Sequence, residues 1–310
     1  MSLDKETIAF IERATASPAP PPDSIPISEF RAAVEAFRPM TFDRVELAEI
    51  RDLSFPSPGP DQGTVTARLY RPETESPAPL VVWAHGGQWV RTTIDLLDSY
   101  FRFLALRSGC AVLAVDYEYA PESQFPTQIE QVYAAALWAR EHGEQLGCDS
   151  SRLAIAGDSS GGNLAAAVAL MARDRGQLQF DHQLLLVPLL DALFESASWQ
   201  ELGEDYLLSK GQLNWALQKY APQTDRRNPM LSPLHAESTA GLPPTTVIVG
   251  GLDPLRDDGL AYAQRLRVEG VPVRTIDIDG LIHHAIVLPK ALPRGLVAVE
   301  EAADALARCW

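Results

Sequence analysis

Residues 153–175, LAIAGDSSGGNLAAAVALMARDR, hold the pattern that decides the fold. The apolar run at 153–156 predicts a buried strand, and the alanine-rich run at 163–175 predicts a helix. Between them, residues 157–161 have the form Gly-x-Ser-x-Gly, which suits a crowded strand-to-helix turn that exposes its serine. The start of the helix also offers N–H groups to negative charge. The pattern therefore predicts that Ser159 is a nucleophile at the carboxyl edge of a sheet.

Strand and helix patterns alternate on both sides of this stretch. Unbroken short apolar runs are typical of strands buried on both faces, and they occur at residues 80–84, 111–115, 153–156, 184–187 and 246–249. Val65, Ala67 and Leu69 alternate with other side chains, which predicts a strand with one buried face. A helical pattern occupies residues 129–137. The alternation predicts an α/β fold with a mostly parallel central sheet flanked by helices.

Two segments interrupt the alternation. Residues 1–50 contain two helical patterns around residues 17–27, which hold five prolines. Residues 191–241 contain a helical pattern and are long enough to form a lid. We therefore expect N-terminal helices over 1–50, a first part of the core over 51–190, an insertion over 191–241 and a second part of the core over 242–310.

A glycine pair follows the apolar run at 80–84, in the sequence His85-Gly86-Gly87-Gln88-Trp89. Two glycines let the backbone bend so that its amides point into a cleft. Together with the N–H of Ser160, the amides of Gly86 and Gly87 are expected to stabilise an oxyanion.

A serine hydroxyl needs a base to take its proton and a carboxylate to orient that base. In this topology the acid and then the histidine follow the serine along the chain, at the ends of strands. Asp253 comes directly after the apolar run at 246–251, and His283 follows the strand-like run at 273–278. These two residues are therefore the predicted acid and base.

Other residues compete for the same roles. Asp257 and Asp258 are alternatives for the acid, but they fall in the next predicted helix, where carboxylates cap or solvate the first turn. His284 is the alternative base. His85 is expected to brace the oxyanion loop, and the remaining histidines are expected on the surface or in packing contacts: His142, His182 and His235.

Composition excludes several function classes. The 310 residues include 26 Lys and Arg against 41 Asp and Glu, a formal net charge of −15. Nucleic acids and anionic membranes are bound by clustered cations, so neither is an expected partner. No His, Cys or carboxylate cluster has the spacing of metal ligands, so no metal site is expected. Three scattered cysteines and a charged start with no signal-like segment favour the cytoplasm.

Four motifs resemble those of the hormone-sensitive lipase family of α/β-hydrolases, and the resemblance covers roughly residues 60–290. Residues 85–87 resemble its HGGG loop and residues 157–163 its GDSAGGN elbow, while DYEYAPE at 116–122 and DPLRD at 253–257 resemble its DYRLAPE and DPLRDE segments. The segment Leu281-Ile282-His283 resembles the one that carries the family's catalytic histidine. The resemblance thus selects Asp253 and His283 over their competitors.

The resemblance implies an α/β-hydrolase fold with a helical cap built from the N-terminal region and the insertion. It implies a carboxylic ester hydrolase of the serine type that acts on short-acyl or small-molecule esters through an acyl-enzyme intermediate, without a cofactor. A small ester is then the partner. Similar proteins form dimers through edge strands, so a homodimer is also allowed.

Three departures from the family pattern stand out. Gln88 replaces the third glycine of HGGG, where its side chain narrows the acyl pocket, donates a hydrogen bond or folds away. His284-Ala285 replaces Gly-Phe, so a second imidazole either contacts substrate, shuttles a proton or packs. Glu118 reverses a charge in a segment that is usually structural.

Bulky side chains in and near the predicted cap have two interpretations, as pocket walls or as the core of the cap: Trp89, Trp199, Tyr206, Leu207, Leu208 and Trp215. We take Gln88, Trp89 and His284 as candidate substrate contacts. Two other functions use the same fold. One is elimination or acyl transfer on a narrow substrate, which Gln88 and His284 would motivate. The other is non-catalytic ligand binding, as in related plant hormone receptors, which lack the catalytic histidine that this chain keeps.

Overall fold

The computed structural model describes residues 3–57, 63–204 and 206–310. Within these ranges the chain forms an eight-stranded sheet in the order β1-β2-β4-β3-β5-β6-β7-β8. β2 pairs antiparallel with β1 and β4, and the other neighbouring strands are parallel. The strands are β1 (Glu49–Pro56), β2 (Thr64–Arg71), β3 (Ala78–Ala84), β4 (Ala111–Asp116), β5 (Cys148–Asp158), β6 (His182–Leu186), β7 (Thr245–Gly250) and β8 (Val273–Ile278).

The predicted α/β fold with a mostly parallel sheet is confirmed. All five apolar runs lie in the central strands β3 to β7, with only Val187 one residue past the end of β6. β2 buries Val65, Ala67 and Leu69 as its alternation predicts. Its Tyr70 is buried as well, because a helix covers the other face and places Phe101 with its ring centroid 5.4 Å away.

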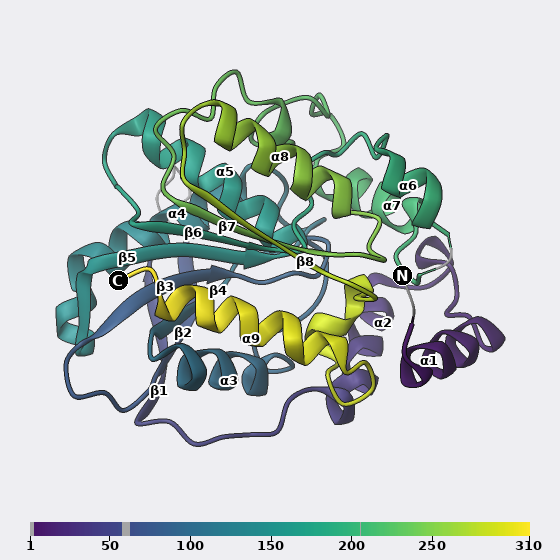
Figure 1. Cartoon of the computed structure of the whole chain (residues 1–310), viewed down its shortest axis with the longest axis horizontal. Helices are drawn as coiled ribbons and strands as arrows, with labels where there is room; N and C mark the ends of the chain where they lie inside the picture. The colour runs from purple at the N-terminus through teal and green to yellow at the C-terminus, as the bar shows by residue number, and fades with distance from the viewer. Residues whose placement is uncertain (1–2, 58–62, 205) are drawn as a thin grey trace.

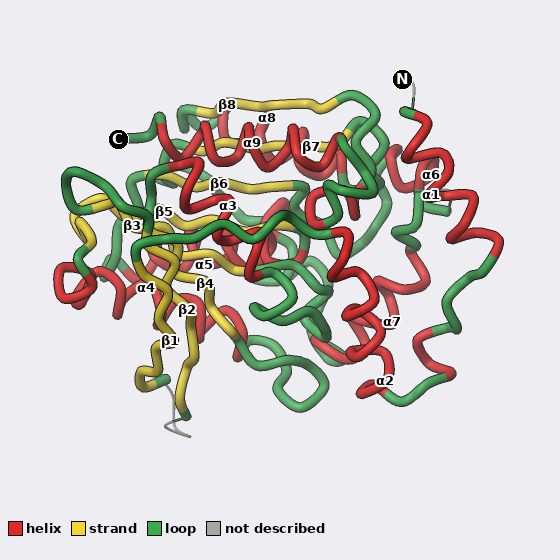
Figure 2. The backbone as a smooth tube through the Cα atoms, turned by 90° about the horizontal axis from the view of Figure 1, so that it is seen from below, coloured by secondary structure: helices red, strands yellow, loops and turns green. Residues whose placement is uncertain are grey.

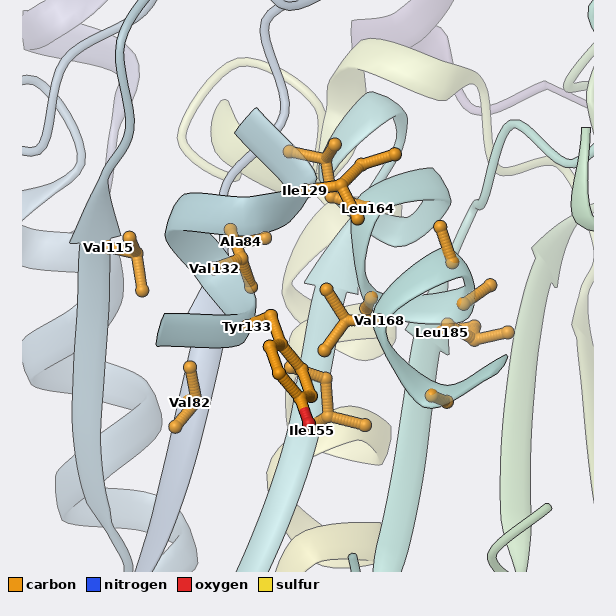
Figure 3. Packing of buried hydrophobic residues seen from close by; sticks show 14 of the residues in the cluster. Val82, Ala84, Val115, Ile129, Val132, Tyr133, Ile155, Leu164, Val168 and Leu185 are labelled. Atoms are coloured by element: carbon orange, nitrogen blue, oxygen red, sulfur yellow. The ribbon is translucent and has the colours of Figure 1, made fainter. Parts of the chain in front are cut away.

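Helices cover both faces of the sheet (Figure 1). One face carries α4 (Thr127–His142), α5 (Ser160–Arg175) and α8 (Arg256–Val268), and the other carries α3 (Asp98–Ser108) and α9 (Arg294–Ala307). Figure 3 shows the first of these two cores, in which side chains from α4 and α5 pack over β3 and β5: Ile129, Val132, Tyr133, Leu164 and Val168 over Val82, Ala84 and Ile155. Burial on both faces fixes the central strands and therefore the position of their ends.

The two segments that interrupt the alternation lie together at one end of the sheet (Figures 1 and 2). The first contributes α1 (Lys5–Ala16), α2 (Ile27–Ala32) and the 3-10 helices η1 (Pro22–Ser24) and η2 (Ala33–Met40). The second contributes α6 (Ala197–Leu202), α7 (Lys210–Tyr220) and η4 (Pro233–His235). They touch through Phe30 and Trp215, whose ring centroids are 4.9 Å apart.

Local signals in the sequence explain how the N-terminal helices are placed. Asp4 caps α1 by accepting a hydrogen bond from the Thr7 amide at 2.7 Å. Arg31 of α2 fastens the segment to the core, because its guanidinium donates to the carbonyls of Val90 and Ala120 and pairs with Glu122. No helix in the described part of the chain combines the length and apolar character of a membrane span.

Candidate active site

The turn between β5 and α5 presents Ser159 at the carboxyl edge of the sheet. Its backbone has φ 55° and ψ −122°, a conformation that side-chain-bearing residues rarely adopt. The neighbouring glycines are required by space: a Cβ on Gly157 would collide with the Gly161 carbonyl, and one on Gly161 with the Ala84 carbonyl of β3. The two glycines of the Gly-x-Ser-x-Gly pattern are thus what allows this turn to pack against β3.

A chain of hydrogen bonds joins the three predicted catalytic side chains. Ser159 Oγ lies 2.8 Å from Nε2 of His283, and Nδ1 of His283 lies 2.7 Å from Oδ2 of Asp253. The other carboxylate oxygen of Asp253 accepts the Leu255 amide at 2.9 Å. An N–H on Nδ1 donated to the carboxylate leaves Nε2 free to accept the serine proton. All three side chains are buried, with Asp253 at 0% exposure.

The strand ends supply this geometry. Asp253 follows β7, and His283 begins the 3-10 helix η5 (His283–Val287) after β8. The Leu252 amide donates to the Leu281 carbonyl at 3.0 Å, which holds the two loops together. The three residues therefore meet because they follow β5, β7 and β8, parallel strands of one sheet whose carboxyl ends lie at the same edge.

The competing carboxylates have other partners. Asp257 pairs with Arg256 at 2.8 Å and accepts the Ser198 amide at 2.8 Å. Asp258, which was expected to cap or solvate its helix, is instead buried where α8 contacts α6, so that expectation was wrong. Burial raises the pKa of Asp258 to about 8. The sequence places Asp258 in the first turn of a helix, but it does not show whether that side of the helix faces solvent or another part of the chain.

The oxyanion loop departs from the expectation at Gly86. Its amide donates to Oδ2 of Asp158 at 2.9 Å, and Oδ1 of Asp158 accepts Nε1 of Trp83 at 2.8 Å. Burial raises the pKa of Asp158, although these hydrogen bonds act in the opposite direction. The amide of Gly87 donates to no acceptor in the described residues, and that of Ser160 is the first of α5.

Gln88 ties this loop to the insertion. Its amide N–H donates to Ser160 Oγ at 2.8 Å, and its side-chain Oε1 accepts Nε2 of Gln212 on α7 at 3.2 Å. Of the alternatives considered for Gln88, the structure therefore shows a side chain that folds onto α7 while still lining the pocket. Nδ1 of His85 lies 2.7 Å from the Gly86 carbonyl, and its ring stacks on Tyr117 at a centroid distance of 4.6 Å, so His85 holds the loop as expected.

A hollow of about 750 Å³, including space open to solvent, lies in front of Ser159. Its walls are mostly apolar, and η2 and η5 supply much of that surface. The lining residues are Val34, Phe37, Thr41, Gly86, Gly87, Gln88, Arg91, Thr92, Leu96, Leu97, Asp158, Ser159, His283, His284, Ile286, Val287 and Leu288.

His284 is part of this wall. Its ring centroid lies 5.5 Å from that of His283, at 84° to it. Burial, followed by the charges of His283 and Arg91, lowers the pKa of His284 to about 3. The second imidazole is therefore neutral at ordinary pH.

The bulky side chains that the sequence offered either as pocket walls or as packing residues do not line this hollow. Trp89 stacks on Tyr220 at 4.4 Å, and Trp199 packs against Phe194 at 5.0 Å. The structure places them in packing contacts, together with Tyr206, Leu207, Leu208 and Trp215. In residues 3–57, 63–204 and 206–310, no three His, Cys, Asp or Glu side chains are grouped so that they could hold a metal ion.

Residues 81–287 match a protein family described by the alpha/beta hydrolase fold. The chain belongs to the hormone-sensitive lipase family of α/β-hydrolases. This hydrolase is 38% identical to the esterase LipI of Mycobacterium tuberculosis over 81% of its own length and 82% of that protein. It is 38% identical to the carboxylic ester hydrolase LipN of the same species, over 76% of its length and 64% of LipN. It is 32% identical to the ethyl acetate hydrolase of Pseudomonas putida over 97% and 98% of the two chains.

Solved structures agree with these relatives. The hydrolase superposes on LAE6, an α/β-hydrolase from the metagenome of Lake Arreo, with a TM-score of 0.92 and 36% identity over 98% of both chains. It superposes on the hyperthermophilic esterase of Pyrobaculum calidifontis with a TM-score of 0.91 and 32% identity over 99% and 98%. The chain is an ester hydrolase of the serine type.

Proposed function

We propose that Ser159, His283 and Asp253 are the catalytic triad of a carboxylesterase acting on short-acyl or small-molecule esters. The single observation that supports this most strongly is the continuous pair of hydrogen bonds, 2.8 Å and 2.7 Å long, from Ser159 through His283 to Asp253. A neutral imidazole held in this tautomer accepts the serine proton as the hydroxyl attacks the ester carbonyl. Asp253 stabilises the imidazolium that forms.

The reaction then follows two acyl-transfer steps. The carbonyl π electrons move to oxygen, and the amides of Gly87 and Ser160 donate to the resulting oxyanion. The C–O bond to the alcohol breaks, and the alcohol leaves with the proton from His283. Water then gives a proton to His283 and attacks the acyl carbonyl. As this second oxyanion collapses, the bond from the acyl carbon to Ser159 Oγ breaks, His283 returns the proton to Oγ, and the acid is released. In this proposal Gly86 supports the loop through Asp158 rather than holding the oxyanion itself.

We propose that residues 1–50 and 191–241 form a helical cap, with the core over 51–190 and 242–310. Support comes from the Phe30–Trp215 contact between the two segments and from the Gln88–Gln212 hydrogen bond to the oxyanion loop. A hollow closed by such a cap favours small esters over long acyl chains. The link from Gln88 to α7 and the neutral state of His284 give neither residue a feature that calls for elimination or acyl transfer.

The test is hydrolysis of p-nitrophenyl esters from acetate to long acyl chains at neutral pH, with the wild type and Ser159→Ala compared. We expect short-chain esters to be preferred and Ser159→Ala to lose several orders of magnitude in kcat. Equal rates in the two proteins would exclude Ser159 as the nucleophile. The exposed Ser24→Ala serves as a matched control and should retain full activity.

We further propose a cytoplasmic location and a homodimer. Cys110, Cys148 and Cys309 are free thiols, which supports a reducing compartment. β8 ends the sheet, and its outer edge offers backbone groups to a second copy. Light scattering coupled to size-exclusion chromatography tests the dimer, and cell fractionation tests the location.

A further inference from the structure

Arg91 stands in the wall of the hollow that contains Ser159 and His283. The centre of its guanidinium lies 4.6 Å from the centroid of the Phe30 ring. Its charge also lies near enough to His284 to help lower the pKa of that imidazole. The guanidinium is therefore held between the cap segment and the loop that carries His283.

Within the described residues, this guanidinium has no anionic partner and donates no hydrogen bond. Arg31, on the neighbouring helix, provides the contrast, because it donates to two carbonyls and pairs with Glu122. Burial without an opposing carboxylate lowers the pKa of Arg91 to about 10, so the group remains charged at neutral pH. Contact with Phe30 stabilises a cation, but it leaves the five N–H donors of the guanidinium unused.

The two buried carboxylates of the site already have other partners. Asp158 lines the same hollow, but its oxygens accept Trp83 and the Gly86 amide. Asp253 accepts His283 and the Leu255 amide. A partly buried cation without a counter-charge is costly for the folded protein. Such a group in a catalytic pocket is a candidate for binding the substrate.

We propose that Arg91 binds a free carboxylate on the substrate, so that the enzyme prefers small esters that carry one negative charge. The planar guanidinium matches a carboxylate with two parallel hydrogen bonds. A single charge fits better than a polyanion, because the chain itself carries a net charge of −15. The apolar walls around Arg91 suit the short carbon chain between that carboxylate and the ester. This proposal rests on the proposed esterase function.

The buried Nδ1 of His284 marks the same part of the wall as polar, because no described residue hydrogen-bonds to it. Since the imidazole is neutral, it adds no second charge. An unpartnered buried nitrogen on a residue that lines the hollow adds to the unsatisfied polar groups on this side of it.

The experiment compares charged and neutral esters of matched length. The charged set contains the monoethyl esters of succinate, glutarate and adipate, with the carboxylate on the acyl part, and 4-acetoxybutyrate, with the carboxylate on the alcohol part. The neutral set contains ethyl butyrate, ethyl valerate, ethyl hexanoate and butyl acetate. For the wild type we expect a higher kcat/KM for one kind of charged ester, either the monoethyl esters or 4-acetoxybutyrate, than for its neutral match. The kind that is preferred shows whether Arg91 meets the acyl part or the alcohol part of the ester.

Arg91→Met should lower the ratio of charged to neutral kcat/KM by roughly ten- to hundredfold, mainly through KM, since a hydrogen-bonded charge pair is lost. Arg91→Lys should restore part of the preference. Arg44→Met removes the same charge from an exposed site, where Arg44 lies 3.8 Å from Glu46, and should leave the ratio unchanged. A wild-type ratio no higher than that of Arg91→Met would overturn the proposal, as would an equal loss on both sets of esters.

Binding gives a second readout that does not need turnover. Calorimetry with Ser159→Ala should show binding of the preferred charged ester, and adding Arg91→Met should remove it. Binding that survives this second substitution would also overturn the proposal. Hydrolysis of neutral esters without any charge preference would reject the role of Arg91 and leave the esterase intact. Hydrolysis that is unchanged in Ser159→Ala would instead reject the proposed nucleophile.

Discussion

Ser159, Asp253 and His283 follow the ends of β5, β7 and β8, three strands locked into one sheet. The side chains that face them across the hollow are held differently, because Gln88 and Arg91 lie on a loop and contact short helical segments. In our proposal, the carboxyl edge of the sheet holds the groups that carry out the chemistry, and the loop and the cap segments hold the groups that meet the rest of the substrate. Changes at the edge should therefore slow all esters alike, whereas changes in the cap should alter preference among esters.

The largest effect is expected from a change at Asp253, at the carboxyl edge of the sheet. Asp253→Asn keeps the size of the side chain but favours the wrong tautomer of His283, so kcat should fall about 10⁴-fold. The loss should be the same for charged and neutral esters, because the carboxylate of Asp253 is hydrogen-bonded to His283 and a backbone amide and does not line the hollow. Steady-state kinetics on both sets of esters measures this. A loss confined to one set would mean that Asp253 takes part in substrate recognition.

Gly87→Ala should produce the next largest effect. Gly87 has φ +126°, and an added Cβ would collide with the Arg91 carbonyl, so the loop must shift. Displacing one oxyanion donor costs about 10²–10³ in kcat. Gly176→Ala is the control, because Gly176 also has a positive φ of +66° but open space around it. The same loss of activity in both variants would point to general destabilisation rather than to the oxyanion loop.

The sequence predicts the residues at the ends of the strands better than the residues that line the hollow. The edge residues occupy fixed positions after buried strands, so apolar runs and the Gly-x-Ser-x-Gly turn locate them. The direction of the Gly86 amide depends on Asp158, 72 residues away, and no local pattern reports such a contact. Arg91 belongs to no motif, and only the assembled cap shows that its charge lacks a partner.

The fold was likewise predictable where burial is regular. The central strands are recognisable because both faces are covered. β1 was not predicted, since its exposed and buried positions do not alternate cleanly. Asp258 was misplaced because its neighbours on α6 come from a segment about sixty residues earlier, and only tertiary packing brings them together.

Asp258 lies where α8 of the core contacts α6 of the insertion, and it tests this contact through the stability of the protein and not through the rate of hydrolysis. Its ordinary pKa of 3.8 is raised to about 8 by burial, so the folded protein favours the protonated form. The stabilising contribution is full below about pH 4 and is lost as pH rises through 8. Relative to Asp258→Asn, the melting temperature of the wild type should fall by several degrees between pH 5 and pH 8, at about 2–4 °C per kcal/mol.

Differential scanning fluorimetry at several pH values measures this difference, with the exposed Asp23→Asn as the control. The control should follow the wild type across the whole range. If the Asp258→Asn curve also runs parallel to the wild type, Asp258 does not change its protonation on folding in this range. Its burial would then not govern the pH dependence of the contact between α8 and the cap segment.

The smallest expected effect concerns the contact between Gln88 and Gln212, where the loop meets the cap. Gln212→Ala removes one neutral hydrogen bond, worth about 0.5–1.5 kcal/mol, so kcat on a neutral short-chain ester should fall only a few-fold. Gln218→Ala is the matched control, because Gln218 lies on the same helix and is exposed. Gln88→Gly removes the same contact from the other side, so combining it with Gln212→Ala should add nothing to the loss. Full additivity of the two changes would show that Gln88 acts independently of α7, and the cap would then influence the oxyanion loop by a different route.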